Sequence, residues 1–138
     1  IPELIIKSLR NIPIETTEGN QTREFNYVDN IIDGLFAVAE INPLPEQVIN
    51  IGSKQEIAIC DLVRKIHKLS DSKSELRIGS LPYRPTEIWR MYSDNVRAEE
   101  VLGWKPRVSF EEGLKCTIEW FRNYLSVFYD VLSPLNKL

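Results

Sequence analysis

The sequence has few glycines and no glycine-rich motif. Its 6 glycines are scattered, and neither G-x-x-G-x-x-G nor G-x-G-x-x-G occurs. Their absence excludes the phosphate-binding loop with which a strand–helix unit holds a dinucleotide. No tyrosine is followed by a lysine four residues later, so an acid/base pair at that spacing is missing as well.

Histidine and cysteine are also scarce. His67 is the only histidine, and a single histidine is too few for a metal site or a Ser-His-Asp triad. We therefore expect no metal and no catalytic residue in this chain. Cys60 and Cys116 each lie in an apolar helical pattern, which predicts two reduced thiols in the core.

The chain lacks both a basic excess and a long apolar run. With 17 Lys and Arg against 20 Asp and Glu, its net charge is −3, which argues against a nucleic-acid partner. No apolar stretch approaches the ~20 residues that span a bilayer, and no signal peptide is evident. We expect a cytoplasmic protein with no membrane partner.

At 138 residues the chain fits one domain, and it begins at Ile1 inside a predicted helix. We therefore expect a fragment of a longer protein. Apolar periodicity predicts a mixed, helix-rich α/β fold. The expected helices cover 2–10, 30–39, 59–69, 95–102 and 110–125, and the expected strands cover 13–16, 25–28, 48–51 and 76–78.

Local signals sharpen several of these expectations. Asp29 is predicted to cap the helix over 30–39, whose apolar arc is wide enough to predict burial on more than one side. Asp94 is predicted to cap the short helix that ends at Gly103. Ser109 and Glu112 form a capping box for the last helix.

Two arginines stand in motifs suited to phosphate. Arg23 opens Arg-Glu-Phe-Asn-Tyr-Val-Asp over 23–29, and Arg84 lies in Tyr-Arg-Pro-Thr-Glu over 83–87. A guanidinium donates two parallel hydrogen bonds to phosphate oxygens, so two arginines on separate loops can hold a diphosphate from different sides. The alternative is that both are surface residues paired with Glu24 and Glu87, a contact that contributes little stability.

These motifs, in this order, resemble the carboxyl-terminal part of extended short-chain dehydrogenase/reductases of the NAD-dependent epimerase/dehydratase family. The resemblance covers roughly residues 1 to 122 and includes Val-Ile-Asn-Ile-Gly over 48–52 and Leu-Gly-Trp-Lys-Pro over 102–106. Thr86 departs from the family's usual glycine, and Asn30 stands where aspartate is common.

The resemblance implies roles for four residues. Arg23 and Arg84 would contact the diphosphate of a nucleotide sugar, and Glu87 would hydrogen-bond a ribose hydroxyl. Asn50 would lie near the phosphates or the sugar, although it is equally well explained as a polar residue that satisfies backbone groups at a strand end. NAD or NADP would be bound by the missing N-terminal Rossmann half, whose Y-x-x-x-K supplies the acid/base.

We therefore predict a substrate-binding portion over 1–126, followed by a C-terminal extension over 127–138 that docks on a surface. It would belong to a nucleotide-sugar epimerase, dehydratase or reductase, as in bacterial polysaccharide biosynthesis, and would be inactive alone. Its partners would be the nucleotide-diphosphate sugar, the N-terminal half and a second copy in a homodimer or swapped oligomer. The alternatives are a stand-alone nucleotide-sugar binding module and an interaction or dimerisation segment.

Overall fold

The computed structural model describes residues 1–42 and 48–132, with side chains described through residue 125. Its fold is mixed α/β, as predicted. In chain order the elements are α1 (Pro2–Leu9), β1 (Ile14–Thr16), β2 (Thr22–Glu24), α2 (Val28–Glu40), β3 (Glu56–Ala58), α3 (Ile59–Leu69), β4 (Leu76–Ile78), β5 (Arg90–Met91), α4 (Val96–Leu102) and α5 (Phe110–Leu132). None of the helices in this part of the chain is long and apolar enough to span a bilayer.

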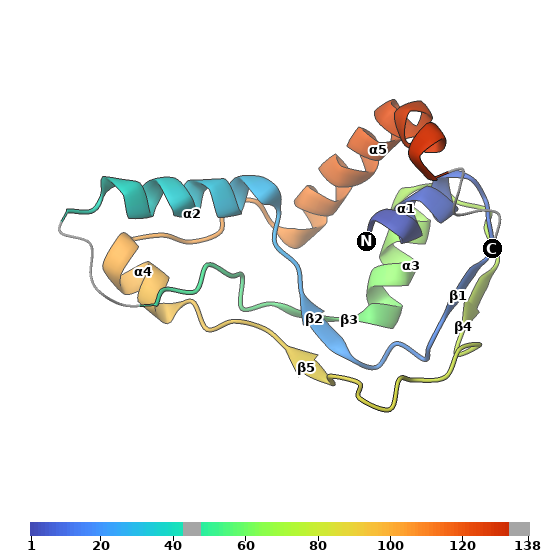
Figure 1. Cartoon of the computed structure of the whole chain (residues 1–138), viewed down its shortest axis with the longest axis horizontal. Helices are drawn as coiled ribbons and strands as arrows, with labels where there is room; N and C mark the ends of the chain where they lie inside the picture. Colours follow the sequence, from blue (N-terminus) through green and yellow to red (C-terminus); the bar gives the residue numbers. More distant parts are fainter. Residues whose placement is uncertain (43–47, 133–138) are drawn as a thin grey trace.

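The short strands form two small sheets (Figure 1). In the first, β1 pairs with β4 in parallel, with Ile14 opposite Leu76. In the second, β2 lies in the centre, antiparallel to β3 and parallel to β5. Strand β2 therefore lies between β3 and β5, which are far apart in the sequence. Its side chains reach the loops next to both of these strands.

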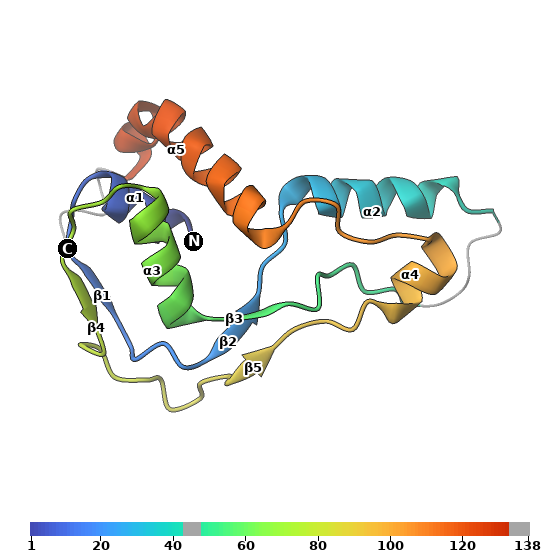
Figure 2. The same cartoon turned by 180° about the vertical axis from the view of Figure 1, so that it is seen from behind.

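The hydrophobic core lies where α1, α3 and α5 pack together beside β3 (Figure 2). Its buried members recur at helical spacing because each helix turns one apolar face toward the others. They are Ile5, Ile6, Ile57, Leu62, Ile66, Leu114, Ile118 and Phe121. The core packs against one edge strand of the second sheet, because Ile57 belongs to β3.

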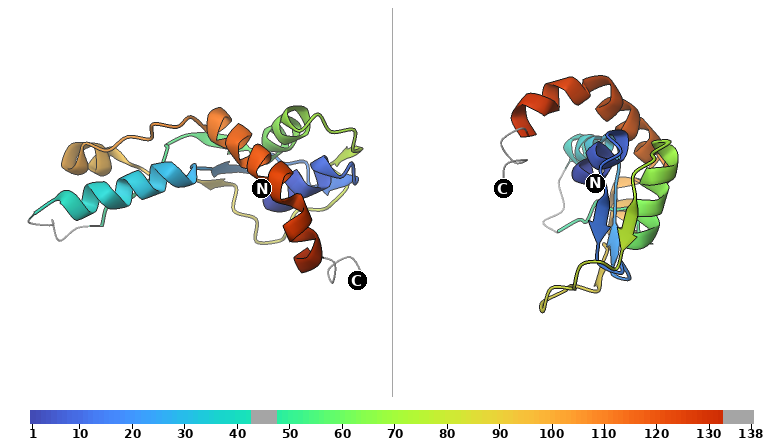
Figure 3. Two further views of the ribbon diagram at one scale, coloured as in Figure 1. Left: turned by 90° about the horizontal axis from the view of Figure 1, so that it is seen from above. Right: turned by 90° about the vertical axis from the view of Figure 1, so that its right-hand side faces the viewer.

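Helices α2 and α4 extend away from this core as an arm (Figure 3). Asn30 of α2 joins the arm to the loop before α5: its Oδ1 accepts from the backbone N–H groups of Arg107 and Val108 at 2.9 Å, and its Nδ2 donates to the Val108 carbonyl at 2.8 Å. The Trp104 indole donates to the Asn30 carbonyl at 3.2 Å. Both side chains are buried, so this junction is polar but satisfied.

Several local predictions are confirmed. The helices at 2–10, 59–69 and 110–125 form, and so do the strands at 13–16 and 76–78. The Asp94 carboxylate accepts from the Val96 N–H at 3.0 Å at the start of α4, and Gly103 ends that helix in the left-handed region with φ of 61°. Of the predicted capping box, the Ser109 half is confirmed: Ser109 Oγ accepts from the Glu112 N–H at 3.2 Å.

Other predictions are wrong. The strand expected over 25–28 lies earlier, over Thr22–Glu24, because those residues pair with β3 and β5. Helix α2 consequently begins at Val28, and Asp29 lies in its first turn without capping it. Residues 48–51 form no strand, because no described segment pairs with them, and Val48 is 79% exposed.

Two burial predictions also fail. The apolar arc of α2 is not buried on several sides, because Leu35 and Phe36 are exposed and only Asn30 and Gly34 of this helix are buried. Cys116 is exposed and Cys60 is half-buried, so neither free thiol is part of the core. Helix α5 continues past residue 126, and side chains from there to residue 138 lie outside the described part. The boundary at 126/127 and the docking of the extension therefore stay predictions.

Candidate functional site

The candidate site is organised by two neighbouring residues of β2. Successive side chains of a strand point to opposite faces of the sheet, so Arg23 and Glu24 reach different loops. Arg23 contacts the segment just before β5, and Glu24 contacts the segment just after it.

On the Arg23 side, the arginine predicted to bind phosphate contacts Glu87, the residue predicted to bind the ribose. Arg23 Nη2 donates to Glu87 Oε1 at 2.8 Å, with the two side chains only 20% and 12% exposed. Arg23 Nη1 donates to the carbonyls of Ile88 at 2.6 Å and Thr22 at 2.7 Å. The guanidinium is therefore fixed in place at the edge of the 83–89 loop.

Arg84 lies on the same loop with its side chain exposed to solvent. The Glu87 N–H donates to the Arg84 carbonyl at 3.1 Å, which closes a turn between the two residues. Within the described residues no hydrogen bond or ion pair engages the Arg84 guanidinium. Tyr83 anchors the loop, because its hydroxyl accepts from the Asn20 N–H at 3.0 Å and its ring lies 4.9 Å from the Trp89 ring.

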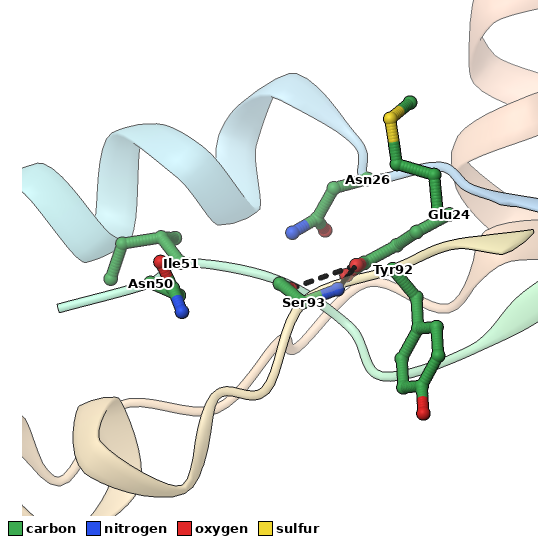
Figure 4. Close-up of a pocket in the computed structure, with 7 residues that line it drawn as sticks. Glu24, Asn26, Asn50, Ile51, Tyr92 and Ser93 are labelled. Atoms are coloured by element: carbon green, nitrogen blue, oxygen red, sulfur yellow. Dashed lines mark hydrogen bonds between the residues drawn. The ribbon is translucent and has the colours of Figure 1, made fainter. Parts of the chain in front are cut away.

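On the Glu24 side, one carboxylate joins two loops to β2, and Figure 4 shows its contact with Ser93 of one of them. Oε2 accepts from the Ser93 N–H at 2.6 Å and the Ser93 hydroxyl at 2.8 Å. Oε1 accepts from the N–H groups of Ser53 and, at 3.2 Å, Lys54. Burial acts to raise the pKa of Glu24, but the hydrogen bonds from Ser93 and Ser53 outweigh it and lower the pKa below its ordinary value.

Asn50 lines a hollow of about 450 Å³ on this second side. Its amide donates to the Asp94 carbonyl at 3.3 Å, and its side chain is exposed. The lining of the hollow consists of Glu24, Asn26, Asn50, Ile51, Met91, Tyr92 and Ser93. The structure thus brings Arg23 and Glu87 into contact and keeps Arg84 on the same loop, whereas Asn50 lines a hollow to which none of the other three contributes.

Sequence reasoning missed the role of Glu24, Ser93 and Gly52. A Cβ on Gly52 would overlap the Ser93 hydroxyl and lie 2.5 Å from Glu24 Oε1, so glycine permits the two loops to meet at the carboxylate. The signal was the acidic residue beside Arg23, which the sequence alone marked only as a possible ion-pair partner. Its true partners are 29 to 69 positions away along the chain.

The chain's own residues do not fit a nicotinamide dinucleotide. The full sequence contains no glycine-rich loop to hold the pyrophosphate and no Y-x-x-x-K. Among the described residues, no cluster of three or more His, Cys, Asp or Glu side chains is suited to a metal ion. What the site offers is arginine, carboxylate and amide groups, which suit binding of a polar, anionic ligand.

The fold is that of the carboxyl-terminal lobe of an extended short-chain dehydrogenase/reductase. A crystal structure of the Bordetella bronchiseptica enzyme WbmF in complex with NAD+ and UDP is 33% identical, with a TM-score of 0.80 over 98% of this chain and 39% of that one. The UDP-glucose 4-epimerase of Thermotoga maritima, solved with UDP-glucose, is 28% identical with a TM-score of 0.81, over 89% of this chain and 39% of that one.

Residues 2–117 match the family model described as GDP-mannose 4,6 dehydratase, and the chain belongs to that family. Among curated relatives, the UDP-glucuronate 4-epimerase of Thermodesulfobacterium geofontis is 29% identical over 115 residues. That alignment covers 83% of this chain and 34% of the relative, so the chain spans about a third of the relative's length. The family predicted from the two arginine motifs is confirmed.

Proposed function

We propose that this chain is the part of a nucleotide-sugar epimerase, dehydratase or reductase that binds the nucleoside diphosphate of the substrate. The observation that carries the proposal is the arrangement of the 83–89 loop. The Arg84 side chain is exposed there and no bond from the described residues engages its guanidinium, while Arg23 and Glu87 are held together at the edge of the loop. The relatives solved with UDP and with UDP-glucose support this choice of ligand class.

The charges of the loop suit a diphosphate. Arg84 offers a full guanidinium to solvent, and each charge-assisted bond it makes to a phosphate contributes about 1.5–3 kcal/mol. Arg23 Nη1 is bonded to two backbone carbonyls, which keep the guanidinium in place. Its Nη2, which donates to Glu87, is then the group that a phosphate oxygen competes for. Glu87 then accepts a hydrogen bond from a ribose hydroxyl, as predicted from its motif.

The cofactor would be NAD or NADP, which supplies hydride transfer when bound, and it would be held by residues outside this chain. Solved relatives contain NAD+ or NADH, which supports this choice of cofactor. The residues of this chain would bind and orient the substrate. Binding energy at a remote diphosphate of this kind is what holds the sugar in a reactive position.

Calorimetric titration of the full-length protein tests the proposal. UDP, dTDP, CDP and GDP are titrated beside NAD, and Arg84→Ala is compared with the unmodified protein. We expect roughly a 10- to 100-fold weaker affinity for the preferred diphosphate and unchanged NAD affinity. Arg64→Ala is the matched control, because Arg64 is also exposed and its guanidinium pairs with Asp61 on α3, away from the 83–89 loop. Unchanged diphosphate affinity in Arg84→Ala would refute the proposal.

A second candidate function, an interaction segment, is favoured by the outer face of α2. Its apolar side chains are exposed at helical spacing, with Val28 57%, Leu35 63% and Phe36 64% exposed. A contiguous apolar helix face of this kind marks a surface that another chain or another part of the same protein covers.

A further inference from the structure

The segment from Glu87 to Ser93 is attached to β2 at both of its ends. Arg23 binds Glu87 and the Ile88 carbonyl before β5, and Glu24 binds Ser93 after it. Because Arg23 and Glu24 are adjacent, one dipeptide of β2 holds this segment from opposite faces of the sheet.

Strand β5 needs these attachments because its own pairing is short. It consists only of Arg90 and Met91, both exposed, and its ladder to β2 comprises two residue pairs. The Thr22 N–H donates to the Trp89 carbonyl at 2.8 Å, the residue just before the strand. A two-residue strand with no buried side chain contributes little packing, so side-chain bonds decide its register.

Glu24 provides the attachment on the carboxyl-terminal side of β5. Both of its oxygens are occupied, Oε2 by Ser93 and Oε1 by the loop at Ser53 and Lys54. Hydrogen bonds to an ionised acceptor are roughly twice as strong as neutral ones. Gly52 leaves the space that this junction fills, since any Cβ there would collide with Ser93 and approach Glu24.

We infer that Glu24 is a positioning residue for the nucleotide site: by holding Ser93 and the 52–54 loop against β2, it fixes β5 and thereby the 83–89 loop that carries Arg84 and Glu87. The inference rests on the proposed function, since it concerns the same site. It assigns to Glu24 no contact with the ligand.

Glu24→Gln in the full-length protein tests the inference. A glutamine has the same shape, but one carboxylate oxygen is replaced by an NH2 group, which donates and cannot accept. That group would face the N–H donors of one loop, so only the loop at the remaining oxygen stays bound. We expect the dissociation constant for the preferred nucleoside diphosphate to rise roughly tenfold, with NAD affinity unchanged. Glu75→Gln is the control: it makes the same charge change at a carboxylate that pairs with Arg77 beside the other sheet.

Gly52→Ala perturbs the same junction without removing a polar group, and it should give the same selective loss. Circular dichroism verifies that each variant is folded at the temperature of the titration. Unchanged diphosphate affinity in both variants would overturn the inference. An equal loss of NAD and diphosphate affinity, or unfolding of both variants, would also overturn it, because either result indicates a purely structural role. If Arg84→Ala leaves diphosphate affinity unchanged, the proposed function fails; if only Glu24→Gln and Gly52→Ala leave it unchanged, the positioning role alone fails.

Discussion

The Arg23 guanidinium and the Glu87 carboxylate lie 2.8 Å apart, although the two residues are separated by 64 positions in the sequence. Both side chains are mostly buried, and Arg23 is further bonded to two backbone carbonyls. Arg23 and Glu87 are each predicted to contact the ligand, and in the structure they also bind each other. A substitution of either residue is therefore expected to change both the stability of the fold and the affinity for the ligand.

Arg23→Ala is therefore expected to weaken both the fold and the affinity for a nucleoside diphosphate. The substitution leaves the Glu87 carboxylate without its partner, and an unsatisfied, mostly buried group of this kind costs about 1–3 kcal/mol. Denaturant unfolding of Arg23→Ala and of exposed Arg84→Ala measures the difference, with Arg84→Ala expected within about 0.5 kcal/mol of the unmodified protein. Adding Glu87→Gln to Arg23→Ala should recover part of the loss; no recovery would argue against the pair.

The carboxylate of Glu56 predicts an acid-dependent loss of stability. Its hydrogen bonds from Arg90 and Thr22 lower its pKa from 4.5 to about 2. Because the pKa is lower in the folded state, this stabilisation is complete above the unfolded pKa near 4.5 and is lost as the pH falls toward 2. Denaturant unfolding of Glu56→Gln and the unmodified protein, measured across this pH range, should converge at the acid end. A constant difference over the range would contradict this assignment.

Asn30 is expected to be the most sensitive polar position of α2. Asn30→Ala removes the acceptor of the Arg107 and Val108 N–H groups, and because these donors are part-buried, each one left unsatisfied costs toward the lower end of about 1–3 kcal/mol. The arm should loosen, which amide hydrogen exchange at residues 107 and 108 detects directly. Asn20→Ala serves as the control, because Asn20 is an exposed loop residue. Unaltered exchange in Asn30→Ala would show that the junction does not depend on this side chain.

The exposed face of α2 predicts self-association of the 138-residue chain when it is studied by itself. Leu35→Glu should reduce the mass-average size in light scattering, because a charge placed in an apolar contact opposes its burial. Ile12→Glu, at an exposed apolar position outside α2, should leave the size unchanged. A size that is independent of concentration and identical in the unmodified protein and both variants would argue against an interaction role for this face.

Local interactions explain which elements could be predicted. Helices α3 and α5 follow from apolar spacing, and the caps at Asp94 and Ser109 follow from hydrogen bonds that span two or three residues. The strand expected at 25–28 was misplaced because its true position depends on partners in β3 and β5. For the same reason, the predicted strand at 48–51 does not form: its apolar residues have no described strand beside them.

The motifs over 23–29 and 83–87, in order with the segments over 48–52 and 102–106, were enough to predict the family and to select Arg23, Arg84 and Glu87 as candidate site residues, because residue types in a fixed order are a property of the chain itself. Only the tertiary structure decided that Arg23 pairs with Glu87 and that Glu24 joins two loops. It also decided that Asn50 lies in a separate hollow. The partners of a side chain that is distant in sequence depend on how strands pair and which face each residue takes, and no local pattern encodes that choice.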